Sequence, residues 1–284
     1  MKETQLSEKP QIGLATPLDQ RSLYLRRQIV RIVECSKRGH LGSAYSLIEI
    51  LRVLYDDILR YDPDNPNWAK RDRCILSKGH GCLALYVILA DKGFYPKDEL
   101  GKFCQADGIL GGHPDYEKIP GVEASTGALG HGLSIGVGFA LSALYDKSDH
   151  RIFVVLGDGE CNEGSIWEAA MSAGNRKLSN LYVLIDYNKQ QSYGTTFSVQ
   201  DLEPFVDKWK SFGFAVAEVD GHDVAALKDV LSQVPLKPDK PTAIICHTVK
   251  GKGICFAENN LTWHHKSKIS DEDIKALYDE LGVC

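Results

Sequence analysis

The chain lacks two features that would point to a membrane or a nucleic acid. No apolar stretch reaches the roughly 18 residues that a membrane-spanning helix needs, and the polar first twenty residues have no signal-peptide core. Lysine and arginine number 33 against 38 aspartate and glutamate residues, which gives a net charge of −5 without a basic stripe. Such a surface has little attraction for nucleic acid. We therefore expect a cytoplasmic protein that binds neither a membrane nor a nucleic acid.

Closely spaced cysteine pairs, internal repeats and low-complexity tracts are also missing. The 8 cysteines show no Cys-x-x-Cys spacing, and several fall in apolar segments. This usage is typical of reduced, mostly buried thiols rather than of a zinc site or a disulfide framework. The length of 284 residues, with 43% hydrophobic and 25% charged residues, fits one large globular domain. We expect a loosely ordered arm over residues 1–15 and a single domain over residues 16–284.

The middle of the chain has the pattern of a strand, a turn, a helix and a second strand. An apolar β-branched run at 152–156 breaks at Gly-Asp-Gly, a helical segment follows over 163–175, and a second apolar run occupies 181–185. This order predicts a βαβ unit with parallel, buried strands, and therefore an α/β fold. Because ligands of such sheets bind at the carboxyl ends of the strands, Asp158 and Asn188 are candidate ligand residues.

The chemistry of Asp158 and Asn188 limits the kinds of ligand that these side chains can bind. Carboxylate and amide oxygens suit Mg²⁺ or Ca²⁺ rather than zinc, and Mg²⁺ usually completes its coordination with phosphates and water. The glycines on either side of Asp158 let the backbone approach a phosphate closely. A plain strand-to-helix turn would also explain Gly-Asp-Gly. The asparagine thirty positions later, at the end of the next predicted strand, favours a metal-held diphosphate.

Three histidines lie in glycine-flanked turns that each follow a predicted element. His40 follows a helix that we expect to begin at Thr16-Pro17 and to end near Gly39, and His80 follows a short predicted strand. His113 belongs to a Gly-Gly-His-Pro turn, whose backbone is constrained by its glycines and its proline. One histidine in a turn is usually solvated or a cap, but three independent core histidines are a poor explanation for this pattern.

Two further segments are candidates for binding an anion. The glycine-rich turn 125–132 opens a predicted helix and can present free N–H groups to an anion. Near the end of the chain, Lys250 and Lys252 follow a predicted buried strand over 241–247. They could clamp a phosphate or lie in a solvated turn, and we favour the solvated turn.

Together these motifs resemble the transketolases. Gly-Asp-Gly-Glu followed about thirty residues later by an asparagine is similar to the thiamine diphosphate signature, and GDGECNEGSIWEAAMSAG, IDYNKQQSYG, RGHLGSA, SKGHG, GHP and TGALGHG are similar to transketolase segments. The resemblance extends from about residue 16 to residue 281, but only to the N-terminal, diphosphate-binding part of the family. It implies the thiamine diphosphate-binding fold, a mostly parallel sheet with helices on both faces.

The resemblance also implies roles for individual residues. A divalent ion, Mg²⁺ or Ca²⁺/Mn²⁺, would be held by Asp158, Asn188 and the main-chain carbonyl of Gln190. The cofactor-binding residues would be His80, Gly127, Leu129, Gly130, Asp158, Gly159, Glu163 and Asn188. Glu163 would lie at a subunit contact near the cofactor. The catalytic histidines would be His40, His80, His113 and His264.

This sequence departs from the family pattern at three of these motifs. Leu41 and Ala128 stand where the family usually has proline, and His265 stands where it has glycine. The contact of Leu129 with the cofactor should survive the change at Ala128. The roles of His131 and His265 stay open.

The resemblance implies transfer of a two-carbon ketol unit from a ketose phosphate to an aldose phosphate, as in the pentose phosphate pathway. The cofactor would act as the electron sink and the histidines would move protons. In the family, the glutamate that activates the cofactor comes from a pyrimidine-binding domain that has no counterpart here. We expect the N-terminal subunit of a split enzyme with a natural end, which pairs with a C-terminal transketolase subunit in a heterotetramer of two copies of each chain.

Two other functions compete with this one. The chain could be a subunit of another thiamine diphosphate enzyme, of the 2-oxo acid dehydrogenase α type or similar to deoxyxylulose-phosphate synthase, although such proteins are not expected to combine the GHP and SKGHG motifs. It could also be a noncatalytic module, although a module has no need of the retained histidines and acidic residues. The sequence does not name the sugar: pentose phosphates are the default, and other ketose phosphates or sulfonated sugars are alternatives.

Overall fold

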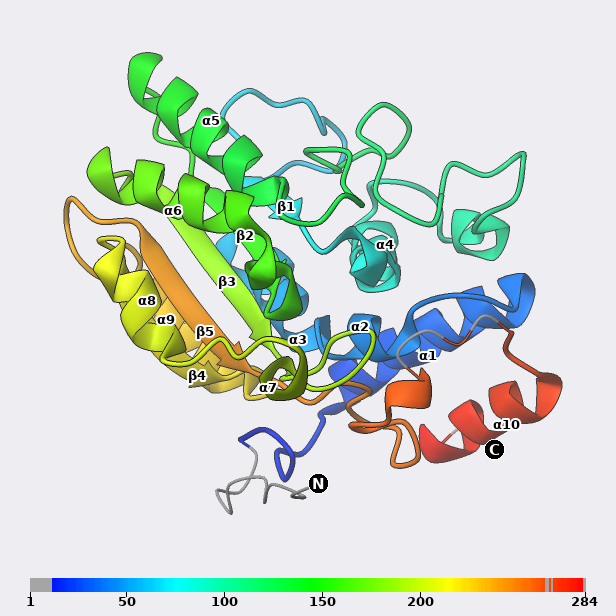
Figure 1. Cartoon of the computed structure of the whole chain (residues 1–284). Helices are drawn as coiled ribbons and strands as arrows, with labels where there is room; N and C mark the ends of the chain where they lie inside the picture. Colours follow the sequence, from blue (N-terminus) through cyan, green and yellow to red (C-terminus); the bar gives the residue numbers. More distant parts are fainter. Residues whose placement is uncertain (1–11, 264–265, 267, 283–284) are drawn as a thin grey trace.

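The computed structural model describes residues 12–263, 266 and 268–282, and it has a parallel sheet at its centre (Figure 1). The five strands are β1 (Arg73–Leu76), β2 (Ile152–Gly157), β3 (Leu181–Tyr187), β4 (Ala215–Asp220) and β5 (Thr242–His247). Their order is β1-β2-β3-β5-β4, and every neighbouring pair is parallel. The predicted α/β fold is therefore confirmed. Most of the predicted arm, residues 1–15, lies outside the described residues, and the domain division stays a prediction.

Strands β2, β3 and β5 are buried along their whole length because their residues are apolar at nearly every position. In β2, Phe153 and Val155 belong to one hydrophobic cluster, while Ile152, Val154 and Leu156 belong to another. Successive side chains of a strand point to opposite faces of its sheet. A continuous apolar run therefore gives the sheet two hydrophobic faces, and each must be covered by helices.

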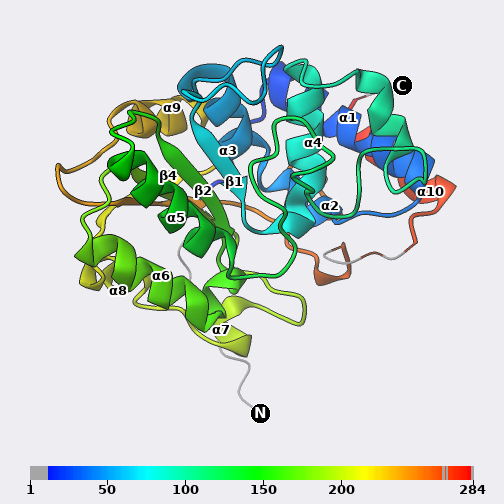
Figure 2. The same cartoon turned by 90° about the horizontal axis from the view of Figure 1, so that it is seen from above.

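Helices cover both faces (Figure 2). The first cluster packs against α1 (Gln20–Ser36), α2 (Leu41–Tyr45), α3 (Ile48–Val53), α4 (Cys82–Asp91), α9 (Val224–Ser232) and α10 (Asp271–Glu280). The second packs against α5 (Gly132–Tyr145), α6 (Gly164–Asn175) and α8 (Phe205–Ser211). The short helix α7 (Thr196–Val199) follows the loop after β3. Helices α1 and α10 contact each other at one edge of the molecule.

The structure corrects the predicted bounds of the first helices. Helix α1 begins at Gln20 rather than at Pro17, because the carboxylate of Asp19 caps it by accepting the Ser22 N–H at 2.8 Å. It ends when Lys37 takes a left-handed conformation with φ of 53°, two residues before Gly39. The residues after His40 form three short segments in place of one long helix: α2, α3 and a π-helical turn (Leu54–Ile58).

The described residues contain no helix that is long and apolar enough to cross a membrane. Their cysteines form no disulfide. Cys74, Cys82, Cys161 and Cys246 are buried, as expected, whereas Cys35, Cys104 and Cys255 are exposed.

Candidate active site

The carboxyl ends of four neighbouring strands converge on one cavity of about 410 Å³. Strand β1 leads to Lys78 and His80, β2 to Asp158, β3 to Asn188, and β5 to Lys250. The cavity is lined by His40, Lys78, His80, His113, Gly127, Leu129, Gly157, Asp158, Gly159, Glu160, Asn188, Gln190, Gln191, Ser192, Tyr193 and Lys250. Residues far apart in the sequence meet here because parallel strands end at the same edge of a sheet.

Asp158 and Asn188 both line this cavity and are almost fully buried. The carboxylate of Asp158 accepts hydrogen bonds from the backbone N–H of Gly159, at 2.8 Å, and of Lys189. Burial and the charge of Asp186 raise the pKa of Asp158 above its usual value. The side-chain oxygen of Asn188 accepts the Gln190 N–H at 3.1 Å. These contacts hold two oxygen-bearing side chains in the cavity at the positions where the sequence predicts metal ligands.

Asp186 is a residue of the site that the sequence analysis missed. It lies in β3, is fully buried, and accepts hydrogen bonds from Ser46, Lys78, Asn188 and Thr248. Burial alone would raise the pKa of Asp186, but the charge and hydrogen bond of Lys78 outweigh it and hold the pKa below its usual value. A charged residue inside an apolar strand is the signal that could have found it, since buried charges are rarely unpaired.

The predicted solvated turn at Lys250 and Lys252 is wrong, because both side chains are buried. Lys250 lines the cavity, and its ammonium group donates to the main-chain carbonyl of Gln190 at 3.2 Å. Burial and the neighbouring Lys78 lower the pKa of Lys250, while Asp158 opposes this change. Lys252 points elsewhere and donates to the carbonyl of Leu14 at 2.6 Å. Of the two lysines, Lys250 can meet a ligand in the cavity.

The glycine-rich turn 125–132 forms a second wall of the cavity through Gly127 and Leu129. Glu160 holds this wall to the sheet: its buried carboxylate accepts the Gly130 N–H at 2.9 Å and the Gly157 N–H at 3.1 Å. Gly130 itself does not line the cavity. Glu163 is exposed and does not line it either, although it lies against Gly130.

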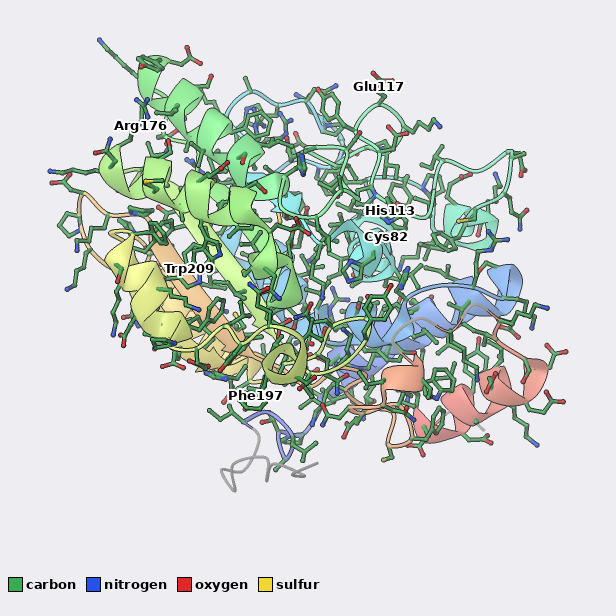
Figure 3. The ribbon with its side chains drawn as sticks, in the orientation of Figure 1. Cys82, His113, Glu117, Arg176, Phe197 and Trp209 are labelled. Atoms are coloured by element: carbon green, nitrogen blue, oxygen red, sulfur yellow. The ribbon has the colours of Figure 1, made fainter. Side chains whose placement is uncertain are left out.

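Three of the four predicted catalytic histidines meet in this cavity. The rings of His40 and His80 are 5.5 Å apart between centroids, in an edge-to-face arrangement. Figure 3 shows His113 close to Cys82 at the start of α4, and the Gly112 carbonyl beside it accepts from the Cys82 thiol at 3.3 Å. His264 and His265 lie outside the described residues. His131 is exposed, with its Nδ1 2.9 Å from the Leu129 carbonyl, and it does not line the cavity.

The residues present fit a metal-bound diphosphate. Asp158, Asn188 and the Gln190 carbonyl are oxygen donors of the kind that Mg²⁺ and Ca²⁺ prefer, and Lys78 and Lys250 line the same cavity. The side-chain Oε1 of Gln190 and Nε2 of Gln191 are buried without a hydrogen-bond partner. No cluster of three histidine, cysteine, aspartate or glutamate side chains suited to a metal occurs among the described residues. The site is therefore suited to a hard cation that shares its coordination with a ligand.

A family model described as "Transketolase, thiamine diphosphate binding domain" matches residues 20–284. The chain belongs to the transketolase family. This match confirms the resemblance of the sequence motifs and the thiamine diphosphate-binding domain. Over 240 residues the chain is 45% identical to an apulose-4-phosphate transketolase subunit of Phocaeicola vulgatus, and the alignment covers 84% of this chain and 85% of that protein. It is 42% identical over 243 residues to the 6-deoxy-6-sulfo-D-fructose transketolase subunit SqwG of Clostridium sp., covering 86% and 88%.

Solved transketolase structures have the same fold. The transketolase of Campylobacter jejuni matches with a TM-score of 0.85 and 32% identity, and that of Pichia stipitis in complex with sedoheptulose-7-phosphate with 0.86 and 32%. Each match covers 93% of this chain but 42% and 40% of the solved chains. The chain thus spans less than half the length of these transketolases, which is consistent with an N-terminal subunit. The roles of the individual site residues stay predictions.

Proposed function

We propose that this chain is the diphosphate-binding subunit of a two-chain transketolase, which transfers a two-carbon ketol unit from a ketose phosphate to an aldose phosphate. The observation that carries the proposal is the convergence of Asp158, Asn188 and Lys250 with three histidines on one cavity. Several relatives that match this chain over most of their own length are named as subunits, which supports a second chain.

In this proposal, Asp158, Asn188 and the Gln190 carbonyl would hold Mg²⁺, or Ca²⁺ or Mn²⁺, and the ion would offset charge on the diphosphate of the cofactor. Lys250 neutralises part of the diphosphate charge. The cofactor contacts come from His80, Gly127, Leu129, Gly130, Gly159 and, at the subunit contact, Glu163. Thiamine diphosphate, when bound, supplies the nucleophilic carbon and the electron sink for cleavage of a carbon–carbon bond.

The histidines of this chain handle the protons of that reaction. Imidazole nitrogens can accept a proton from a sugar hydroxyl and return it near neutral pH, because the usual pKa of histidine lies there. His40, His80 and His113 line the cavity, so their rings can reach one sugar chain. His264 is proposed as the fourth. Leu129 adds an apolar surface to the wall of the cavity.

The surface supports association with further chains. Helix α5 is apolar on nearly every side, yet Leu144 and Tyr145 are 49% and 79% exposed. A helix of this composition is normally buried, and on neighbouring α6 Met171 is also exposed at 56%. We propose that this face contacts the C-terminal subunit or a second copy, in a cytoplasmic heterotetramer. We propose that the activating glutamate comes from the partner chain, in line with the relatives that are named as subunits.

The test is a calorimetric titration of thiamine diphosphate with Mg²⁺ into this chain alone, and into its mixture with a candidate C-terminal subunit. We expect the isolated chain to bind thiamine diphosphate weakly and the mixture to bind it tightly. Only the mixture should catalyse ketol transfer. Transfer by the isolated chain would contradict the need for a second chain. Absence of cofactor binding in both preparations would reject the enzymatic proposal and favour a noncatalytic module.

A further inference from the structure

A second cavity of about 290 Å³ lies next to the cavity described above. The two cavities share His40, His80 and His113 as lining residues. A ligand whose reacting atoms lie among the three histidines can therefore extend into this second space. Its lining is partly apolar, with Leu83 and Phe103, so it is more than an open rim of the first cavity.

The second cavity carries positive charge. Arg38 and Lys266 line it, and none of the described residues that line it is an aspartate or a glutamate. Among the described residues, the guanidinium group of Arg38 has no hydrogen-bond or ion-pair partner. Lys266 is held in place, since its ammonium group lies 4.1 Å from the ring centroid of Trp263 and 2.6 Å from Asp273. Asp273 offsets much of the Lys266 charge, which leaves Arg38 as the dominant cation.

A thiol lies within electrostatic reach of Arg38. Cys104 lines the cavity, is exposed, and is fixed by its backbone N–H, which donates to the Leu110 carbonyl at 2.8 Å. Burial of part of its side chain raises the pKa of Cys104, and the charge of Arg38 acts in the opposite direction. The cation and the thiol therefore face the same space.

We propose that this second cavity binds the anionic end of the sugar substrate, a tetrahedral oxyanion such as a phosphate or a sulfonate, with Arg38 as its main ligand and Lys266 as its second. The inference rests on the proposed function, because it assumes that the carbonyl of the sugar reacts among the histidines. The planar guanidinium group suits this role, since it donates two parallel hydrogen bonds to a tetrahedral oxyanion. Through Arg38, this chain contributes to the selectivity of the enzyme for charged over uncharged sugars.

The first test uses the isolated chain and needs neither cofactor nor partner. Cys104 is alkylated with anionic iodoacetate and with neutral iodoacetamide, and the two rates are measured at this residue by mass spectrometry. Their ratio cancels the intrinsic reactivity of the thiol. We expect Arg38→Ala to lower the ratio by about fivefold to tenfold, because a local cation enriches anions, and inorganic phosphate to protect Cys104 in the wild-type chain but not in the variant.

The matched control is Arg176→Ala, which removes the same charge from an exposed position at the end of α6, far from His113 (Figure 3). It should leave the alkylation ratio within about twofold of the wild-type value, because exposed charges separated by more than a Debye length are screened. A ratio that is unchanged in Arg38→Ala, or equally changed in both variants, would overturn the anion site.

The second test uses the assembled enzyme and compares one ketose with and without its phosphate. The kcat/KM ratio of the charged over the uncharged sugar should fall at least about tenfold in Arg38→Ala, recover partly in Arg38→Lys, and stay unchanged in Arg176→Ala. An unchanged ratio in an enzyme that still binds cofactor and transfers ketol units overturns the inference alone. Failure of the wild-type mixture to bind cofactor instead rejects the proposed function, whatever the alkylation result.

Discussion

The side-chain amide of Asn188 donates a hydrogen bond to the carboxylate of Asp186 at 3.2 Å. The same carboxylate forms an ion pair with Lys78 at 2.5 Å, and all three side chains are buried. Because the Nδ2 group is used in this way, the Oδ1 atom of Asn188 is the one left to face the predicted metal. Asp186 thus orients Asn188, a predicted metal ligand, without lining the cavity itself, as the outer hydrogen-bond partners of metal ligands commonly do.

Removing Asp186 should damage both stability and ligand binding. Asp186→Ala leaves the Lys78 ammonium buried without its partner, which we expect to cost about 3–5 kcal/mol in the free energy of unfolding. It should also weaken Mg²⁺-dependent cofactor binding by about 10–100-fold. Urea unfolding and calorimetry measure the two effects. The control is Asp207→Ala, which removes an exposed ion pair with Lys210 and should change stability by less than about 1 kcal/mol.

Substitutions of the two buried lysines should have different effects on the protein. Lys250→Met should reduce the affinity for thiamine diphosphate by about tenfold or more, because it removes a cation from the wall of the diphosphate cavity. Lys252→Met should leave that affinity within about twofold and act on stability instead, because its ammonium group bonds to the Leu14 carbonyl. Titration of the cofactor into the assembled complex checks this. Equal loss of affinity in both variants would show that Lys250 has no particular role.

Gly127 should tolerate no side chain. Its φ of +148° is rarely adopted by other residues, and an added Cβ would lie 3.1 Å from the ring of His113. We expect Gly127→Ala to weaken cofactor binding and to lower ketol transfer by at least about tenfold, because a displacement of about 1 Å in a catalytic group can cost that much. Gly101→Ala is the matched control, since a Cβ there meets no atom within 4 Å. A Gly127→Ala enzyme with normal activity would contradict the proposed position of His113.

His113 should contribute to ketol transfer rather than to the stability of the fold. His113→Asn should lower kcat for ketol transfer by about 10²–10⁴-fold, the usual range for loss of a general acid–base group. Its thermal unfolding midpoint should stay close to that of the wild-type chain, because the side chain is exposed at the cavity. A loss confined to stability, with normal turnover, would argue against a catalytic role.

The buried Glu49 should make the chain labile to acid. Burial would raise the pKa of Glu49, but Arg26, 2.6 Å away, and His222 outweigh it and hold the pKa well below the usual 4.5. Nε2 of His222 accepts the Val249 N–H at 2.9 Å, so its Nδ1 carries the hydrogen that is donated to Glu49 at 2.8 Å.

A carboxylate whose pKa is lower in the folded state stabilises the fold above its unfolded pKa, and this stabilisation is lost as the pH falls. The free energy of unfolding should therefore decrease by about 2 kcal/mol or more below pH ~4.5. Glu49→Gln should be less stable at pH 7, because Arg26 loses its charged partner, but its stability should fall less steeply with acid. Denaturant unfolding between about pH 3 and 7 measures both slopes, and equal slopes would contradict the assignment.

Local patterns in the sequence were sufficient to predict the parallel sheet and part of the candidate site. The apolar runs ending in Asp158 and Asn188 predicted adjacent parallel strands, and the structure pairs β2 with β3 in that way. The glycine-flanked turns correctly brought His40, His80 and His113 to one cavity. These features depend on neighbouring residues, because strand alternation and turn conformation are set within a few positions.

The sequence by itself therefore determined the local order of strands and turns, the family, and the placement of Asp158 and Asn188 after neighbouring strands. Only the tertiary structure decided that Lys250 and Lys252 are buried and point in different directions, that Asp186 joins Lys78 to Asn188, and that Arg38 and Cys104 share a cavity. The physical reason is that the burial, pairing and pKa of a charged side chain depend on groups that chain folding brings from distant parts of the sequence. Such partners leave no periodic signal next to the residue itself.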